Sequence, residues 1–523
     1  MYPSLNQFLR WASHYKAVPI WVEPELPAVD LLDWVHNQIG AQQRLFFLHS
    51  GWQSAGGQAP PNPQARYSYF SLEPPRYVLE SRDGNLMVRY QSGSGSRFDA
   101  LKVGNPFERF HGWLRHWNGP RVDGLPPFWG GAVGYFAYES ARYMDPALAK
   151  VLRKSQKPGA LSTQDFFDFE FGLYDSVAAV DHARRRLWLV HTLLLPERKN
   201  NSPAQLERMY RTAQDRLRRQ AVRLQKSIRS PRVWGEFRAS GVRSNRSEAA
   251  YRLMVRRAKG YLSSGDIYQA NLSQSLSATW EGDPWSLYRN LAAINPSPYA
   301  SLWRSGSRWI VSASPELLLR LESDRVETRP IAGTYPRSGV QEQDRQVVRS
   351  LTSDIKERAE HLMLVDLERN DLSRVCRSPS VRVKEAFSVE GYSHVFHLVS
   401  DIRGELAPGH GWREAVKACF PGGTITGCPK IRCMELIQKL EPQPRGPYCG
   451  SLGWIGYNGD ATLNILIRSI FLDKGRLRFP VGAGIVADSD PGREYEETLH
   501  KAQALVQALR GSGVGSLLHR KDP

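Results

Sequence analysis

Two pairs of glutamates have the spacing of carboxylates that bind a metal ion. Glu357 and Glu360 lie in DIKERAEHLMLV, and Glu494 and Glu497 lie in GREYEETLHKAQ. Both segments have a helical pattern, so a spacing of three residues places each pair on one helix face. Carboxylates from two facing helices would suit Mg²⁺, which takes a few carboxylates together with waters and a substrate oxygen. Either pair alone is more typical of a solvated helix face.

Three glycine-bearing segments would allow backbone amides to approach a ligand. FPGGTITGCPK (420–430) precedes a helical pattern, and free N–H groups at a helix N-terminus can hold a carboxylate. Its spacing is not that of a phosphate-binding loop. VGAGIVADSD (481–490) and RPIAGT (329–334) have the pattern of a strand followed by a turn. Each segment taken singly is more often an ordinary turn.

Other reactive side chains give weaker signals. His394 and His397 occur in the predicted strand EGYSHVFHLVS, where a histidine is more often structural than catalytic. Lys501 follows Glu497 by four residues, which is also the spacing of a helix salt bridge. The sequence contains no Gly-x-Ser-x-Gly and no glutaminase nucleophile motif. The five cysteines include no Cys-x-x-Cys, so we expect reduced, structural thiols.

The elements that must position these residues fall into two regions. Residues 1–228 are predicted to hold strands, separated by Gly and Pro clusters, followed by a basic helix from residue 203. Residues 229–246 have weak periodicity and are predicted to be a connection. The second region covers residues 247–509 and contains all the motifs above. We expect residues 510–523 to form a frayed tail.

Composition limits the class of protein. The chain has 523 residues, of which 41 % are hydrophobic, so it can bury a large core. No apolar run approaches the ~20 residues of a membrane span, and the first residues lack the pattern of a signal peptide. We therefore expect a cytoplasmic protein without a membrane partner.

The net charge of +18 raises the alternative of a basic nucleic-acid-binding protein. Much of the excess lies in arginine runs such as 184–186 and in the stretch 208–232. The sequence shows no aromatic-basic RNA-binding signature, zinc module or helix-turn-helix pattern. Solvated helix faces explain the charge better, so we expect no nucleic-acid partner.

Taken together, the motifs resemble the chorismate-utilising enzymes, a family that contains anthranilate synthase component I, aminodeoxychorismate synthase component I, and the isochorismate and salicylate synthases. The resemblance is close over residues 247–509 and looser before them. It is carried by SPELLL (314–319), RPIAGT (329–334), DIKERAEHLMLVDLERNDLSRV (354–375), EGYSHVFHLVSDIRG (390–404), FPGGTITGCPKIRCMELI (420–437) and VGAGIVADSDPGREYEET (481–498). It implies an α+β fold with two large antiparallel β-sheets packed as a sandwich and surrounded by helices.

The resemblance also implies a metal site for Mg²⁺. By position, Glu360 and Glu497 match the direct ligands, and Glu357 and Glu494 match residues that support the ion through bound waters. The ion would grip the ring carboxylate of chorismate.

Further roles follow from the same resemblance. Glu316 matches the general acid that protonates the departing hydroxyl at ring carbon 4, a task that requires a raised pKa. His397 matches the family's active-site histidine, and Lys501 would lie near the ring carboxylate. The remaining implied residues would bind the substrate dianion or line its pocket: Thr424, Arg468, Gly482 and Gly484.

One residue separates the branches of the family. The position after Pro330-Ile331 is lysine in isochorismate, salicylate and typical aminodeoxychorismate synthases, and alanine in typical anthranilate synthases. Here it is Ala332, which cannot act as a base or nucleophile. The branches that add water are therefore disfavoured, and amination at carbon 4 or at carbon 2 stays open at this position.

Other segments resemble the aminodeoxychorismate branch, namely FLHS (47–50), FGLYDSVAAVDH (171–182), SGDIYQANLSQ (264–274) and FPGGTITG (420–427). The resemblance thus predicts aminodeoxychorismate synthase component I, of 4-aminobenzoate and folate biosynthesis, with anthranilate synthase component I as the alternative. Trp454 departs from the family's usual tyrosine, which implies one hydrogen bond fewer to the substrate carboxylate. Because no glutaminase domain is present, ammonia would come from solution or from a separate glutamine amidotransferase subunit.

Overall fold

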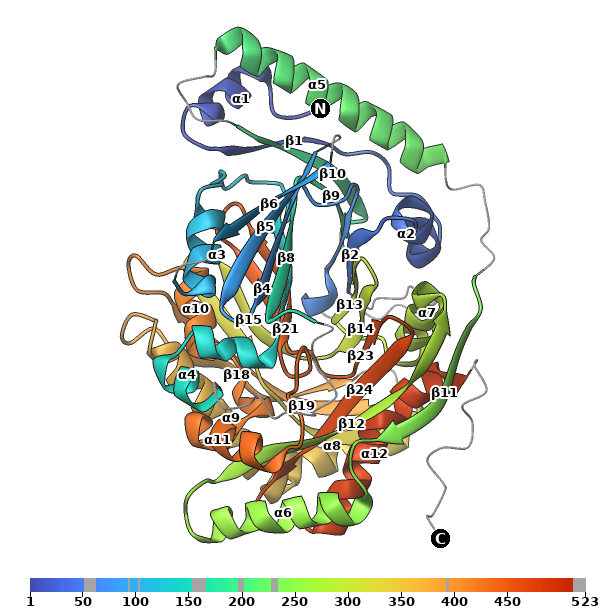
Figure 1. The fold of residues 1–523 in the computed structure, drawn as a ribbon, viewed down its shortest axis with the longest axis vertical. Helices are drawn as coiled ribbons and strands as arrows, with labels where there is room; N and C mark the ends of the chain where they lie inside the picture. Colours follow the sequence, from blue (N-terminus) through green and yellow to red (C-terminus); the bar gives the residue numbers. More distant parts are fainter. Residues whose placement is uncertain are drawn as a thin grey trace.

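Two antiparallel β-sheets of twelve strands each form the centre of the protein (Figure 1). The structure is a computed structural model that describes residues 1–50, 63–92, 95–101, 104–152, 166–195, 202–226, 234–391 and 395–510. In spatial order, the first sheet contains β1 (Ala17–Val22), β10 (Arg186–Leu194), β9 (Ser176–Asp181), β3 (Tyr67–Ser71), β2 (Arg44–His49), β13 (Tyr299–Ser305), β14 (Arg308–Ser314), β23 (Ser469–Asp473), β24 (Arg476–Ile485), β12 (Gln269–Gly282) and β11 (Phe237–Ser244), with β20 (Gly427–Cys428) paired to β12.

The second sheet has the same size and is also antiparallel. Its order is β17 (Ile331–Pro336), β19 (Val395–Glu405), β16 (Arg325–Arg329), β15 (Leu317–Glu322), β22 (Ala461–Asn464), β21 (Ser451–Gly456), β7 (Gly131–Phe136), β8 (Phe169–Tyr174), β4 (Tyr77–Arg82), β5 (Asn85–Ser92) and β6 (Gly95–Leu101), with β18 (Arg382–Gly391) paired to β19.

Large aromatic side chains join the two sheets. Phe46 of the first sheet meets Tyr174 of the second with ring centroids 4.7 Å apart, and Tyr135 meets Trp303 edge-on at 5.2 Å. Such pairs bury large apolar areas and favour tilted or edge-to-face geometry. The sandwich confirms the predicted α+β fold.

Both sheets contain strands from both sequence regions. In the first sheet β2 pairs with β13 through His49 and Ala300, and in the second β7 pairs with β21 through Phe136 and Ser451. The regions 1–228 and 247–509 therefore share one core. The predicted connection 229–246 contains β11, an edge strand whose mostly exposed side chains explain its weak periodicity.

Helices cover the outer faces and the ends of the sandwich. Their bounds are α1 (Leu5–Ala12), α2 (Leu31–Ile39), α3 (Pro106–Arg115), α4 (Pro146–Leu152), α5 (Pro203–Lys226), α6 (Glu248–Ser263), α7 (Pro284–Ile294), α8 (Gln341–Ser353), α9 (Ile355–Ser373), α10 (Trp412–Cys419), α11 (Lys430–Leu440) and α12 (Pro491–Ala508); short 3₁₀ turns include η1 (Pro63–Ala65), η2 (Tyr138–Tyr143) and η7 (Gly423–Ile425). Figure 1 shows α1 and α5 at one end and α6 and α12 at the other. None of the helices in the described part of the chain has the length and apolar character of a membrane span.

Two of these helices reach the predicted site from different sheets. Helix α9 packs on β17 and β19 of the second sheet, whereas α12 packs on β24 of the first. The start of α12 is fixed by Asp490, whose carboxylate accepts the amides of Gly492 and Arg493 while Pro491 occupies the first turn. Both glutamate pairs lie on these two helices.

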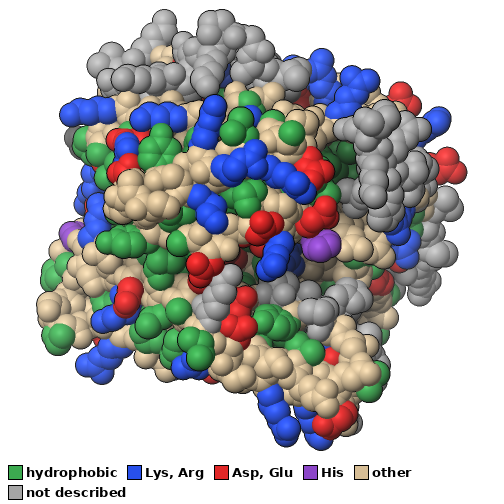
Figure 2. Space-filling model, turned by 90° about the horizontal axis from the view of Figure 1, so that it is seen from below, with side chains coloured by type: hydrophobic (Ala, Val, Ile, Leu, Met, Phe, Trp, Pro, Cys, Tyr) green, Lys and Arg blue, Asp and Glu red, His purple; other side chains and the backbone are tan. Residues whose placement is uncertain are grey.

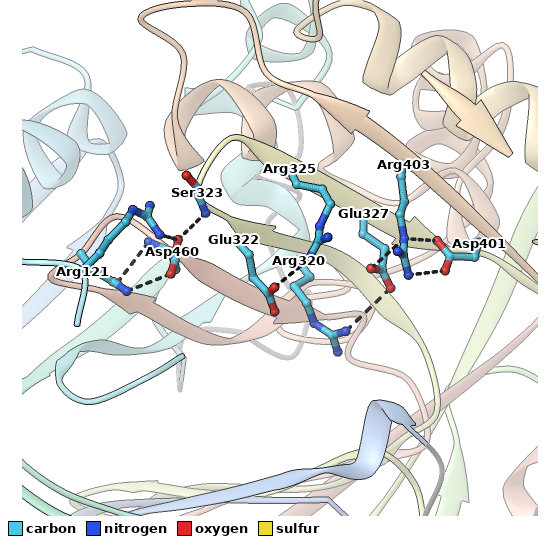
Figure 3. A network of polar contacts seen from close by, with 10 residues as sticks. Arg121, Arg320, Glu322, Ser323, Arg325, Glu327, Asp401, Arg403 and Asp460 are labelled. Atoms are coloured by element: carbon cyan, nitrogen blue, oxygen red, sulfur yellow. Dashed lines mark hydrogen bonds and ion pairs between the residues drawn. The ribbon is translucent and has the colours of Figure 1, made fainter. Parts of the chain in front are cut away.

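Alternating charges cross-link the strand that follows Glu316 to its neighbours (Figure 3). Arg320 on β15 and Arg403 on β19 both contact Glu327 of the intervening strand β16, at 3.7 and 3.2 Å. Arg403 also pairs with Asp401 at 2.7 Å. Opposite charges at facing strand positions stabilise the strand register, so β15 is held firmly at the base of the site.

Candidate active site

Glu316 occupies the junction between β14 and β15, and its side chain is 4 % exposed. Its amide donates to Ser314 Oγ at 3.3 Å, and its carbonyl oxygen accepts from the Ile465 amide at 3.0 Å. The Ser314 hydroxyl in turn donates to the Ile465 carbonyl at 2.6 Å. The backbone that carries this carboxyl is therefore fixed to the segment that leads to Arg468.

The surroundings of Glu316 favour its protonated form. Burial raises the pKa of the Glu316 carboxyl to about 8, and the nearby Glu368 carboxyl adds to the shift. The Thr424 hydroxyl, the Ile331 amide and the positive charge of Arg468 oppose it. Because desolvation dominates, the group carries a proton at neutral pH and is suited to donate it.

The segment FPGGT forms the turn η7 beside this carboxyl. The Gly423 amide donates to Glu368 at 3.2 Å, and the Thr426 hydroxyl donates to the Gly422 carbonyl at 2.8 Å. Helix α11 begins at Lys430, where the predicted loop 420–430 ends, and the short strand β20 lies within that loop. The loop is thus fixed by a hydrogen bond within its own segment and by a hydrogen bond to α9. It places Thr424 near Glu316.

His397 lies on β19 and is buried. Its Nδ1 is 3.1 Å from the carbonyl oxygen of Gly333, which can only accept, so Nδ1 carries the proton. Burial, together with the charges of Arg468 and Lys501, lowers the pKa of His397 to about 3. The ring is therefore neutral at neutral pH. His394 lies outside the described residues.

Gly333 connects this histidine to the first glutamate pair. It has a positive φ of 61°, and a Cβ there would come within 3.0 Å of a Glu357 carboxylate oxygen. Ala332 precedes it on β17, opposite Leu398 of β19. The residue that separates the branches of the family therefore lies between Ile331, which contacts Glu316, and Gly333, which contacts His397.

Arg468 occupies the loop between β22 and β23. Its φ is positive, at 49°, and its carbonyl oxygen accepts from the Ala313 amide at 3.1 Å. A positive φ is unusual for a residue with a side chain and is often retained at functional sites. Its charge acts on both Glu316 and His397.

Lys501 joins α12 to the glycine-rich strand β24. Its Nζ donates to the Gly482 carbonyl at 3.1 Å and pairs with Glu497 at 2.7 Å. A Cβ on Gly482 would lie 2.9 Å from the Leu272 carbonyl and 3.0 Å from the Tyr448 hydroxyl. The glycine thus permits close packing of α12, β12 and Tyr448 around one backbone position.

Gly484 lies two residues further along β24, where a Cβ would come within 2.8 Å of Gln269 Nε2. Both predicted glycines therefore allow close approach to their neighbours. Tyr448 was not predicted from the sequence, because it lies in an unremarkable segment, PYCG, and is brought to Gly482 only by the fold.

Trp454 lies in the core between the sheets. Its ring stacks on Phe128, with centroids 5.0 Å apart, and meets Tyr69 at 6.3 Å. It lines a cavity of about 220 Å³ together with Leu48 and Tyr299. The structure therefore groups Trp454 with the sandwich core, and the tyrosine that lies against Gly482 is Tyr448.

The four metal-binding candidates lie on the two helices that flank these residues. Glu357, Glu360 and Glu494 are half-buried, whereas Glu497 is exposed. The described residues include no group of three or more acidic, histidine or cysteine side chains arranged to hold an ion. Mg²⁺ needs only one or two protein carboxylates with waters and substrate oxygens. The glutamate carboxylates on α9 and α12 are ligands of the kind that Mg²⁺ prefers.

The site therefore combines a protonated carboxyl, a neutral imidazole and two cations. Glu316 can give a proton, whereas Arg468 and Lys501 can attract an anion. Thr424 acts on Glu316, Ala332 lies between the residues that contact Glu316 and His397, and the Gly482 carbonyl accepts from Lys501. This arrangement suits acid-assisted loss of a hydroxyl from an anionic substrate.

Known proteins share this architecture and sequence. The profile of the family described as chorismate binding enzyme matches residues 75–507. Aminodeoxychorismate synthase component 1 of Bacillus subtilis is 38 % identical over 85 % of this chain and 89 % of its own length. Anthranilate synthase component 1 of Synechocystis is 34 % identical over 97 % of this chain and 99 % of its own.

A solved structure, anthranilate synthase component I from Streptococcus pneumoniae, is also similar. It superposes with a TM-score of 0.70 at 29 % identity, over 87 % of this chain and 95 % of its own. The profile match and the relatives agree with the motifs from which the resemblance was inferred. The chain therefore belongs to the family of chorismate binding enzymes.

Proposed function

We propose that this protein is an aminodeoxychorismate synthase component I, which converts chorismate and ammonia to 4-amino-4-deoxychorismate and water. The buried, protonated Glu316 beside Arg468 carries the proposal. A carboxyl with this environment can protonate a departing hydroxyl on a substrate that is itself a dianion. The choice of branch is supported by the segments at 47–50, 171–182, 264–274 and 420–427.

In the proposed reaction, Glu316 gives its proton to the hydroxyl at ring carbon 4, and the C–O bond breaks to release water. Ammonia forms the new C–N bond at the same carbon, and the proton that the nitrogen then loses restores Glu316. Arg468, Lys501 and the backbone near Gly482 would hold the substrate carboxylates. Neutral His397 would line the site without giving up a proton there.

Mg²⁺ would be held by the glutamate pairs of α9 and α12, as the carboxylate donors of both helices permit. When bound, the ion would neutralise a substrate carboxylate and fix the ring in place. The direct ligands would be Glu360 and Glu497, with Glu357 and Glu494 in support.

A second candidate activity is that of anthranilate synthase component I. Ala332 favours it, because alanine cannot form an adduct at ring carbon 2 and leaves that carbon open to ammonia. Attack there would yield anthranilate and pyruvate. Relatives with either activity have similar sequence identity to this chain. Ala332 therefore favours the second activity, whereas the four segments named above favour the first.

The ammonia source would be a separate glutamine amidotransferase subunit or free ammonium. Nucleic acid is not a proposed partner. The face of the molecule in Figure 2 carries acidic side chains interspersed with basic and hydrophobic ones. A nucleic-acid-binding surface gathers basic side chains into a continuous stripe, and the described residues on the face in Figure 2 form no such stripe.

One assay distinguishes the two activities. The purified protein is incubated with chorismate, Mg²⁺ and ammonium, and a lyase that aromatises aminodeoxychorismate is then added. We expect 4-aminobenzoate only after the lyase is added, and we expect Glu316→Gln to form either product roughly 10²–10⁴ times more slowly. Fluorescent anthranilate that forms without the lyase, with an equal amount of pyruvate, would replace the first proposal by the second.

A further inference from the structure

A buried charged cluster lies beneath the turn that carries Thr424. Glu368 and Asp371 on α9 are 3 % and 2 % exposed. Lys430, at the start of α11, places its Nζ 2.5 Å from Asp371 and 3.3 Å from the Cys419 carbonyl. Lys430 thus acts on both buried carboxyls and pairs directly with Asp371, on which the charge of Arg374 also acts.

Glu368 uses its carboxylate oxygens to join two other parts of the fold. Oε1 accepts from the Gly423 amide at 3.2 Å, and Oε2 accepts from the Thr328 hydroxyl of β16 at 3.1 Å. A Cβ on Gly423 would come within 2.4 Å of Leu367 Cδ2, so the turn η7 lies directly on α9. The carboxylate is therefore the polar contact between helix and turn.

The next residue along the turn reaches Glu316. Thr424 follows Gly423 directly, and its hydroxyl favours the ionised form of Glu316, whereas the negative charge of Glu368 opposes it. Glu316 is also faced by Arg468 and by the Ile331 amide. Burial and the Asp371 charge raise the pKa of Glu368 to about 7, against the opposing effects of Lys430, the Gly423 amide and the Thr328 hydroxyl, so Glu368 is ionised at the pH of about 8 at which Glu316 loses its proton.

We propose that Glu368 is a positioning residue for Glu316: its ionised carboxylate fixes the Gly423–Thr424 turn against α9 and keeps the proton on Glu316. The two carboxyls share one buried region, and like charges there disfavour simultaneous ionisation. Glu368 has its own hydrogen-bond donors at both oxygens, so it is the better placed to carry the negative charge. The inference rests on the proposed role of Glu316 as general acid.

The test is Glu368→Gln, which keeps an oxygen for the Gly423 amide and removes the charge. We expect the basic limb of the pH–rate profile to move down by about one pH unit, with KM for chorismate nearly unchanged. Glu368→Ala also removes the acceptor of the Gly423 amide, so KM should rise several-fold in addition.

The titration of Glu316 is followed directly through its carboxyl infrared band, assigned by its loss in Glu316→Gln. This midpoint should fall in Glu368→Gln, whatever product the enzyme makes. The matched control is Glu139→Gln, since Glu139 also accepts two backbone amides, those of Arg445 and Gly446, and is not among the groups that act on Glu316. Glu139→Gln should leave the midpoint in place.

The outcomes separate the two proposals. An unmoved midpoint in Glu368→Gln, or an equal fall in Glu139→Gln, overturns the role of Glu368 and leaves that of Glu316 intact. If the midpoint of the Glu316 titration falls only in Glu368→Gln, the electrostatic coupling between Glu368 and Glu316 is established. Full activity of Glu316→Gln in the same experiments would show that Glu316 is not the general acid.

Discussion

The Nδ1–H group of His397 donates a hydrogen bond to the Gly333 carbonyl oxygen over 3.1 Å. This contact fixes the tautomer, because a carbonyl oxygen cannot donate. Burial and two nearby cations keep the ring neutral. The His397 ring is therefore neutral with an unprotonated Nε2, and in the proposed function the proton comes from Glu316.

This tautomer can be observed directly. In ¹⁵N-labelled protein, the His397 resonances should show protonated Nδ1 and unprotonated Nε2 from about pH 5 to 8, since the pKa of His397 is lowered to about 3. His410, which also contacts a backbone carbonyl, serves as a second histidine for comparison. Titration of His397 near pH 6.5 would contradict the assignment.

Loss of the proton on Glu316 should stop catalysis. Glu316→Gln preserves shape but cannot donate a proton, so kcat should fall by roughly 10²–10⁴ with little change in chorismate affinity. Wild-type activity should decline as pH rises through about 8, the raised pKa of this carboxyl. Weaker chorismate binding at an unaltered kcat would reassign Glu316 to substrate binding.

The same residue should affect stability with a defined sign. Between the ordinary carboxyl pKa of 4.5 and about 8, the folded state holds a proton on Glu316 that the unfolded state has lost. Its contribution to the free energy of unfolding therefore falls as pH rises through this window. Denaturant unfolding should show that the free energy of unfolding decreases less between pH 5 and pH 8 for Glu316→Gln than for the wild type. An equal loss would place the Glu316 pKa near its usual range.

Removal of one carboxylate from α9 or α12 should weaken Mg²⁺ binding by orders of magnitude, since a charged ligand to a hard cation is lost. We expect Glu360→Gln and Glu497→Gln to abolish turnover at low Mg²⁺ while the circular dichroism spectrum stays unchanged. Calorimetric titration of Mg²⁺ in the presence of chorismate measures the effect. Glu496→Gln, on the same helix as Glu497, is the control. Near-normal activity of Glu360→Gln at low Mg²⁺ would exclude Glu360 as a ligand.

The two glycines of β24 should respond differently to alanine. In Gly482→Ala the methyl group meets the fixed Leu272 carbonyl at 2.9 Å, whereas in Gly484→Ala it meets the movable end of the Gln269 side chain. We expect Gly482→Ala to cost about 1–3 kcal/mol of stability and to raise KM for chorismate. Gly484→Ala should be milder in both measurements. The reverse order would mean that β24 moves more freely than its packing indicates.

Local patterns in the sequence predicted many elements well. The strands predicted within residues 1–228 include β2, β3 and β10 of the structure, and the basic helix from residue 203 corresponds to α5. The three strands are recognisable because they are apolar and almost entirely buried, and α5 is recognisable because it buries one apolar face. The edge strand β11 lacks such a face, so its sequence resembled a connection.

The site was only partly accessible to sequence reasoning. Recognisable motifs contain Glu316, His397, Arg468 and Lys501. In the fold, the charge of Arg468 acts on the pKa of both Glu316 and His397, and the charge of Lys501 acts on the pKa of His397. Tyr448 and Glu368 escaped, because their partners are distant in sequence: Gly482 for the first, and Thr328 and Gly423 for the second. Trp454, predicted from its place in GSLGWIGYNG to line the substrate pocket, stacks on Phe128 in the core, and its role with substrate stays a prediction.

The shared strands of the two sheets affect how the chain is made. In the first sheet β24 lies between β23 and β12, and β13, from the middle of the chain, lies beside β2, from its start. A nascent chain that ends before residue 469 would lack β23 and β24, leaving the edges of β14 and β12 unpaired. Unpaired edges promote association with other chains. Strands β23 and β24 must therefore be made before β14 and β12 can pair along both of their edges in the first sheet.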